Sequence, residues 1–252
     1  MIFDGDVVLV TGGSRGIGRA VAREFAATGA TVVVQYRQDR RAAEKVLSEL
    51  GPGAHIALQA DVADPGQVQS LVQSVVERLG GIGVLVNNAG VYERHPVPTT
   101  DYTEWQEAWR RTIDTNLIGP ANLVHRVVPH MIAAGGGRIV NVTSRGAFRG
   151  EPEHPAYGAS KAGLNSLSQS LAQALAPHGI YVTAVAPGFV ETDMAAPYLH
   201  GADGAAVRAQ SPLGRPATPE EIARVIVFLA SPGTEYAIGA IVDVNGASYL
   251  RS

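Results

Sequence analysis

Seven short apolar runs alternate with helical stretches along this chain, and this alternation restricts the possible folds more than any other feature. The runs are rich in β-branched residues and occupy positions 7–10, 31–34, 55–59, 84–87, 138–142, 181–185 and 240–244. Several are apolar throughout, which is typical of parallel strands buried on both faces. Strands separated by helices predict an α/β fold built on a doubly wound, seven-stranded parallel sheet with right-handed crossovers.

Start signals for helices lie between these runs. Asp64 precedes Pro65, the order of an N-cap followed by proline in the first turn. Thr218 stands three residues before Glu221, the spacing of a capping box. Two long helices are expected over residues 101–134 and 156–177. No linker or repeat divides the sequence, so residues 1–252 are predicted to form a single domain.

Composition and charge exclude several classes of function. The chain has 252 residues, 46% of them hydrophobic, and a net charge of −3, which does not favour nucleic acid or an anionic membrane as partner. The absence of cysteine excludes disulfides and thiolate metal sites. His125 and His130 miss the i, i+4 spacing of a helical metal pair, and no metal is predicted. The N-terminus does not resemble a signal peptide, so a cytoplasmic location is expected.

A glycine-rich segment follows the first predicted strand and precedes a helix. Glycines there let the backbone turn sharply and approach a pyrophosphate, whose charge lies at the positive end of the helix. The spacing is G-x-x-x-G-x-G rather than the more common G-x-G-x-x-G. The residues predicted to bind a dinucleotide in this segment are Gly12, Ser14, Arg15, Gly16, Ile17 and Gly18.

The end of the second strand bears on the type of dinucleotide. A carboxylate there would hold the ribose hydroxyls of NAD, but the sequence has Tyr36 and Arg37. Together with Arg15, Arg37 favours the additional phosphate of NADP, because arginine forms bidentate bonds with phosphate. Against this, Asp39 is close by, and the arginines of residues 37–41 also suit a solvated helix start. NADP is therefore predicted, with NAD as the alternative.

A phenol and an ammonium group occur at helical spacing in Tyr157 and Lys161. If the segment is helical, the two side chains share one face, and a lysine cation would lower the pKa of the phenol. Such a tyrosine can donate a proton to a carbonyl oxygen or remove one from an alcohol. Ser144 ends the fifth strand, where its hydroxyl could hydrogen-bond the substrate oxygen.

These motifs together resemble the short-chain dehydrogenase/reductase family, most of all its members of the 3-oxoacyl-acyl-carrier-protein reductase type. The resemblance covers essentially the whole chain and implies a Rossmann fold, with Ser144, Tyr157 and Lys161 as catalytic residues. It also implies that Asn116 holds a water that links the catalytic lysine to solvent, and that Lys161 binds the nicotinamide ribose. Further coenzyme-binding residues implied by the family pattern are Asp61, Val62, Asn88, Ala89, Gly90, Pro187, Gly188, Val190 and Thr192.

The resemblance is less informative about the substrate. Carrier-protein reductases usually present basic residues at two places where this chain has Gly135 and His178, which disfavours an acidic carrier protein as a dedicated partner. A small ketone, keto ester or sugar-like substrate remains, with specificity expected in the loops at 91–95, 145–154 and 189–213. Arg94, Arg145 and Arg149 are either solvated or ligands for a substrate carboxylate.

The sequence thus predicts an NADP-dependent reductase that converts a carbonyl group to a secondary alcohol. An NAD-dependent alcohol or sugar dehydrogenase is the alternative within the enzymes. A nucleotide-sensing regulator and a purely structural role are disfavoured by the intact Ser144, Tyr157 and Lys161. The two long helices carry more apolar surface than one sheet face should require, and in the family such helices pair across a twofold axis, so a homotetramer is expected.

Overall fold

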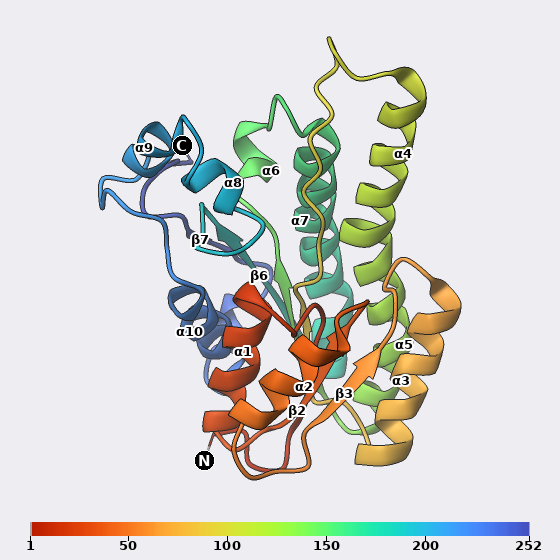
Figure 1. Ribbon diagram of the computed structural model, residues 1–252. Coiled ribbons are helices and arrows are strands. Elements are labelled where there is room, and N and C mark those ends of the chain that lie inside the picture. Colours follow the sequence, from red (N-terminus) through yellow and green to blue (C-terminus); the bar gives the residue numbers. More distant parts are fainter. Residues whose placement is uncertain (1, 252) are drawn as a thin grey trace.

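A computed structural model describes residues 2–251, and its seven strands are those expected (Figure 1). They form one parallel sheet in the order β3-β2-β1-β4-β5-β6-β7. The strands are β1 (Val7–Val10), β2 (Thr31–Tyr36), β3 (Ile56–Gln59), β4 (Val84–Asn87), β5 (Gly137–Val142), β6 (Ile180–Pro187) and β7 (Ile241–Val244). The predicted doubly wound α/β fold is therefore confirmed, and β2 and β6 extend beyond the predicted ends.

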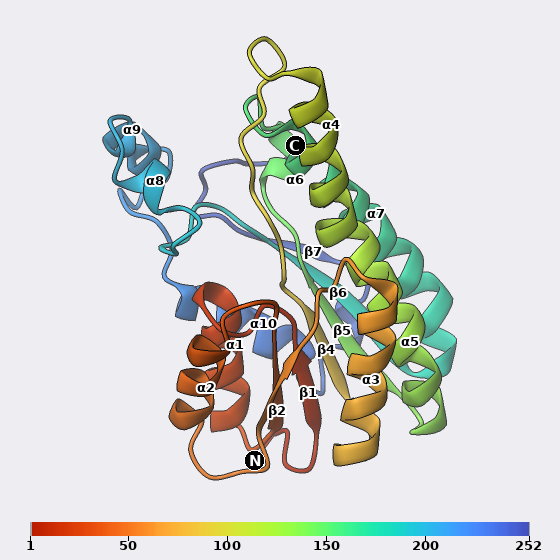
Figure 2. The ribbon, with the colours of Figure 1, turned by 45° about the vertical axis from the view of Figure 1, so that its right-hand side comes forward.

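Helices cover both faces of the sheet (Figure 2). One layer contains α1 (Gly16–Ala27), α2 (Arg40–Glu49) and α10 (Pro219–Ala230), and the other contains α3 (Pro65–Leu79), α5 (Gly119–Ala133) and α7 (Pro155–Leu175). Successive residues of a strand point to opposite faces. In β1, Val8 and Val10 accordingly pack in the first core, and Leu9 packs in the second.

The predicted helix starts are correct. Asp64 caps α3 by accepting hydrogen bonds from the backbone N–H groups of Gly66 and Gln67, at 2.8 and 3.1 Å. Thr218 and Glu221 form a complete capping box at the start of α10. These caps satisfy backbone donors that a helix leaves without intrahelical partners.

The long helix expected over residues 101–134 is not uniform. It consists of α4 (Tyr102–Ile113), a π-helical segment η1 (Asp114–Ile118) and α5. A π-helical turn holds one more residue than an α-helical turn, and such insertions are frequent at functional sites. The second expected helix, 156–177, is α7, which ends in a 3₁₀ turn, η2 (Ala176–His178).

Short helical segments gather beyond the carboxyl ends of the strands. They are α6 (Gly146–Arg149), α8 (Ala196–Leu199) and α9 (Gly204–Ala209), and Figure 2 shows α8 and α9 standing away from the sheet. A further 3₁₀ turn, η3 (Glu235–Ala237), precedes β7. Within residues 2–251, no helix has the length and apolar character needed to span a membrane.

A chain of buried polar side chains joins β4, β5 and α7. Asn87 Nδ2 donates to Asn141 Oδ1 at 2.8 Å, and Asn141 Nδ2 donates to Ser168 Oγ at 2.8 Å. Ser168 in turn donates to the carbonyl of Leu164 at 2.6 Å. Buried amides and hydroxyls are stable only when hydrogen-bonded, so this chain specifies one position of α7 on the sheet.

Replacement of the buried hydroxyl should therefore destabilise the fold. We expect Ser168→Ala to lower the free energy of unfolding by about 1–3 kcal/mol more than Ser170→Ala, because it leaves the amide of Asn141 without its acceptor. Ser170 is an exposed serine on the same helix, so the two variants share the same change in helix propensity. Urea denaturation at one protein concentration measures the difference. Equal unfolding free energies would contradict the structural role given to Ser168.

Candidate active site

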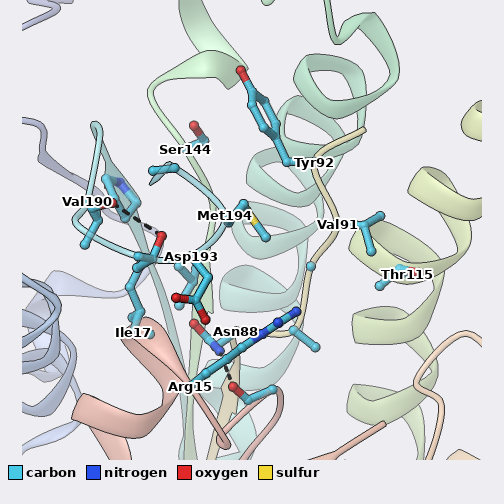
Figure 3. Close-up of a pocket in the computed structure, with 18 of the residues that line it drawn as sticks. Arg15, Ile17, Asn88, Val91, Tyr92, Thr115, Ser144, Val190, Asp193 and Met194 are labelled. Carbon is cyan, nitrogen blue, oxygen red and sulfur yellow. Dashed lines mark hydrogen bonds between the residues drawn. The ribbon is translucent and has the colours of Figure 1, made fainter. Parts of the chain in front are cut away.

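One pocket, with a volume of about 350 Å³, lies at the carboxyl ends of the central strands. It extends from Arg37 after β2 to Tyr157 on α7. Figure 3 shows Arg15 and Asn88 at its lower end, and Ser144 and Tyr92 at its upper end. The structure brings nineteen of the predicted site residues to this pocket: Gly12, Ser14, Arg15, Gly16, Ile17, Tyr36, Arg37, Asp61, Val62, Asn88, Ala89, Gly90, Ser144, Tyr157, Lys161, Pro187, Gly188, Val190 and Thr192.

Two predicted residues, Gly18 and Asn116, lie behind the pocket wall. A Cβ atom on Gly18 would lie 2.6 Å from Asn88 Nδ2, so the position lets α1 pack close under the glycine loop. Asn116, in the π-helical segment, is fully buried. Its Oδ1 accepts from the N–H of Val91 at 2.8 Å, and its Nδ2 donates to Val91 O and Ser160 Oγ at 3.0 and 3.2 Å. Its predicted role through water stays a prediction.

The glycine loop is held by its neighbours in the sheet. Thr11 Oγ1 accepts from the backbone N–H groups of Asn88 and Ala89, at 2.9 and 3.0 Å. The side chain of Asn88 donates to the carbonyls of Thr11 and Gly12, at 2.8 and 3.2 Å. From β2, the side chain of Gln35 accepts from the N–H of Gly12 at 2.8 Å. The loop is thus preorganised, and α1 begins without a side-chain cap on its first turn.

Two cations border the pocket at this end, Arg15 directly before α1 and Arg37 directly after β2. Arg15 and Arg37 are both exposed, and within residues 2–251 neither forms an ion pair. Asp39 also borders the pocket, but its carboxylate caps α2 by accepting from Ala42 N at 2.9 Å. Arg40 pairs with Glu44 in solvent at 2.7 Å, as a solvated helix start would. The solvated interpretation therefore holds for Arg40.

At the other end of the pocket, α7 presents Tyr157 and Lys161 one turn apart on one face. Lys161 Nζ donates to the carbonyl of Val142, the last residue of β5, at 2.8 Å. The same Nζ lies 5.8 Å from the centre of the Tyr157 ring. Ser144 follows β5, and its Oγ accepts from Gly146 N at 3.0 Å. A strand end and a helix start therefore place the three groups around one region of the pocket.

Burial controls the protonation of this pair. It raises the pKa of Tyr157 to about 12, although the Ser144 hydroxyl acts in the opposite direction. Burial also lowers the pKa of Lys161 to about 8. The sequence predicted a lowered pKa for Tyr157, and in this structure the pKa is instead raised, because desolvation by burial outweighs the opposing hydrogen bond of Ser144. Tyr157 is consequently a protonated phenol at neutral pH.

An aromatic cluster supports Tyr157 from the side. The Tyr92 ring stacks on His154 at 3.8 Å between centroids and meets the Tyr157 ring edge-on at 4.6 Å. His154 Nε2 shares a hydrogen bond of 2.6 Å with the hydroxyl of Tyr198 on α8. Burial lowers the pKa of His154 to about 4, so its ring is neutral at physiological pH. At the start of α7, the backbone N–H of Ala156 donates to Nε2 of His95 at 3.1 Å.

Several pocket residues were not predicted from the sequence. Gln35 could have been found, because a buried polar residue inside an apolar strand indicates a specific partner. Most of the others lie in the three loops where specificity was expected, whereas Thr115 lies in the π-helical segment η1. Their individual roles had no local signal in the sequence. Further side chains that line the pocket are Tyr92, Thr115, Arg145, Glu151, Phe189, Asp193, Met194 and Ala195. Within residues 2–251, no group of three or more histidine, aspartate or glutamate side chains could hold a metal ion.

The residues present fit a dinucleotide. A Cβ atom on Gly12 would meet the backbone of Ala89 at 3.0 Å, and Gly12 has a positive φ of 60°. The loop therefore requires glycine, leaves backbone N–H groups at the start of α1 for a pyrophosphate, and joins the cationic end of the pocket to the end that holds Tyr157.

Comparisons with known proteins agree with this geometry. A family model described as enoyl-(acyl carrier protein) reductase matches residues 12–247. The 3-oxoacyl-[acyl-carrier-protein] reductase FabG of Staphylococcus aureus is 38% identical over 96% of this chain and 97% of its own length. Galactitol 2-dehydrogenase of Agrobacterium fabrum is also 38% identical, over 99% of this chain and 100% of its own.

A solved structure gives the same result. The crystal structure of a protein from Brucella melitensis, titled short-chain dehydrogenase/reductase SDR: glucose/ribitol dehydrogenase, has a TM-score of 0.90 and 34% identity, and the match covers 99% of each chain. Sequence and fold are therefore similar over nearly the whole length. The chain belongs to the short-chain dehydrogenase/reductase family of oxidoreductases.

Proposed function

We propose that this protein is an NADP-dependent oxidoreductase that reduces a ketone, keto ester or 3-oxoacyl group to a secondary alcohol, with Tyr157 as proton donor. The observation that carries the proposal is the pocket itself. It has Ser144, Tyr157 and Lys161 at one end, and at the other end Arg15 and Arg37, which form no ion pair within residues 2–251. We further propose that residues 1–252 form a single coenzyme-binding and catalytic domain. The cytoplasmic location stays a prediction from the sequence.

The protein residues would act as follows. A bound nicotinamide coenzyme supplies the hydride for reduction. The Ser144 hydroxyl orients the carbonyl oxygen by hydrogen bonding, and Tyr157 transfers its proton to that oxygen as negative charge develops. Its pKa of about 12 keeps the phenol protonated at neutral pH, which is the form that reduction requires. Lys161 is placed to stabilise the phenolate that remains and, by family pattern, to hold the nicotinamide ribose.

The direction of the reaction and the coenzyme have an alternative. Galactitol 2-dehydrogenase is as similar to this chain as the 3-oxoacyl-[acyl-carrier-protein] reductase is. The family relationship therefore supports an alcohol or sugar dehydrogenase equally well, and NAD is the coenzyme of that alternative. Arg15 and Arg37 favour NADP, because the extra phosphate would neutralise two cations that have no other partner in residues 2–251.

The proton donor can be tested by removal of one oxygen atom. Tyr157→Phe should reduce turnover at least about 10²-fold, because the general acid is lost while the ring keeps its packing. Coenzyme binding should remain nearly unchanged. Tyr102→Phe, on the exposed start of α4, is the matched control and should keep full activity. Steady-state rates and coenzyme titration measure both effects. A Tyr157→Phe enzyme with more than half of the wild-type rate would refute the assignment.

Coenzyme preference follows from the two arginines. A charge-assisted bond made to NADPH alone should favour NADPH over NADH by at least about tenfold in kcat/KM. Arg37→Gln should reduce that preference, and Arg15→Gln should do the same. Arg40→Gln removes a nearby arginine that does not border the pocket, and should leave the preference unchanged. All rates are compared at one moderate salt concentration, because exposed charges are screened. Equal efficiency with NADH in the unmodified enzyme would favour the alternative.

The predicted homotetramer is retained as a proposal. Ile118 and Ile132 in the η1–α5 region and Phe228 on α10 leave large apolar side chains exposed, which supports helix pairing across symmetry axes. Light scattering at micromolar concentration should give about four times the chain mass of 26.3 kDa. A mass near that of one chain would contradict the proposal.

A further inference from the structure

Two charged side chains line the pocket beside Tyr157 and have no part in the proton transfer described above. They are Arg145, directly after Ser144, and Glu151, in the loop before α7. Within residues 2–251, neither forms an ion pair, with the other or with any residue. Arg145 is buried and Glu151 is half-buried. Charges withdrawn from water, even in part, are costly unless they have partners, so this pair calls for a ligand that supplies them.

Arg145 is held in place by neutral groups. Its side chain and backbone are 4% exposed. Its N–H donates to Pro187 O at 2.9 Å, its Nη2 donates to Gln210 Oε1 at 2.6 Å, and its guanidinium lies 4.9 Å from the centre of the Phe189 ring. These contacts fix the position of the guanidinium but leave its positive charge uncompensated. From the sequence, Arg145 was either a solvated loop arginine or a ligand for a substrate carboxylate. Its burial excludes the solvated interpretation.

Glu151 lies near the phenol of Tyr157. Its Oε2 accepts a long hydrogen bond of 3.4 Å from Tyr92, whose ring contacts the Tyr157 ring. Burial raises the pKa of the Glu151 carboxyl, while Arg149 and Arg145 act in the opposite direction. The negative charge of Glu151 contributes to the raised pKa of Tyr157. Arg145 and Glu151 therefore interact electrostatically across the pocket without forming an ion pair within residues 2–251, and Glu151 acts in the same way on Tyr157.

The chemistry of a substrate decides whether both charges find partners. An apolar acyl chain would supply none. A keto acid would pair with Arg145 but would bring its carboxylate toward Glu151. A hydroxyl group donates one hydrogen bond and accepts others, so neighbouring hydroxyls can donate to the carboxylate and accept from the guanidinium.

We propose that Glu151 and Arg145 form a specificity pair for substrates that carry hydroxyl groups next to the reacting carbon, namely a polyhydroxylated ketone and the polyol formed from it. This inference rests on the proposed oxidoreductase function and narrows its substrate class. In reduction, the coenzyme hydride and its electron pair form the new C–H bond, and the proton from Tyr157 forms the O–H bond. The neighbouring hydroxyls are unchanged, and the coenzyme is oxidised.

Acetoin and butanone test the proposal because they differ by one hydroxyl next to the carbonyl. We expect a kcat/KM ratio of at least about tenfold in favour of acetoin, the size of one hydrogen bond to a charged group. Glu151→Gln and Arg145→Met should each bring this ratio toward one, mainly by loss of acetoin turnover. Galactitol oxidation should fall in both variants. Arg145→Lys keeps the positive charge and should retain more acetoin turnover than Arg145→Met, which shows that the loss in Arg145→Met is not due to misfolding. Thermal denaturation of each variant measures its stability.

The surface pair Arg94 and Glu153 supplies matched controls. These residues form an exposed ion pair at 2.6 Å. They are close in sequence to the pocket-lining Tyr92 and Glu151, but neither of them lines the pocket. Glu153→Gln and Arg94→Met should keep the acetoin-to-butanone ratio of the wild type, because exposed ion pairs contribute little.

Three results separate the two levels of the proposal. A wild-type ratio near one, or control variants that change it as much as Glu151→Gln does, would overturn the specificity pair. Efficient reduction of an acetoacetyl thioester together with failure on acetoin and galactitol would also overturn it, yet would leave the reductase function intact. No turnover of any of the four substrates with either NADP(H) or NAD(H) would instead contradict the proposed function.

Discussion

The active site depends on how α7 is docked on the sheet. Lys161 donates to the carbonyl that ends β5, and Ser168, two turns further along the helix, accepts from Asn141 of the same strand. Both contacts are buried, and each polar group has a high free-energy cost if left unpaired. The helix therefore cannot slide or rotate without loss of these bonds. This constraint determines where the Tyr157 phenol lies.

The coenzyme end of the pocket depends on the same sheet. The order of the strands reverses direction between β1 and β4, and ligands of open α/β sheets bind at such a point. Asn88, after β4, donates two hydrogen bonds to Thr11, after β1, at this point. Because β4 also pairs with β5, the glycine loop and the proposed catalytic groups are fixed to one rigid framework. Preorganisation of this kind reduces the cost of alignment when a hydride must reach a carbonyl carbon.

The other end of the pocket, where a substrate is proposed to bind, is formed by loops that connect strands to helices. Tyr92, Glu151 and Phe189 come from three separate segments, and His154 joins α7 to α8 through Tyr198. Loops of this kind can change without effect on the framework, which explains how one family accommodates relatives named for a carrier-protein thioester and for a sugar alcohol. In this chain, that end of the pocket carries two charged side chains, the buried Arg145 and the half-buried Glu151.

The sequence by itself determined the sheet, because β1 and β4 are apolar at almost every position and their periodicity does not depend on distant contacts. It also determined the caps at Asp64 and Thr218 and the residue types of the coenzyme loop, since these features are local. Only the tertiary structure decided the π-helical segment around Asn116, whose partners Val91 and Ser160 are far away in the chain. Burial decided the rest. It raised the pKa of Tyr157 against the expected effect of Lys161 and withdrew Arg145 from solvent, and desolvation depends on every neighbour in space rather than on sequence spacing.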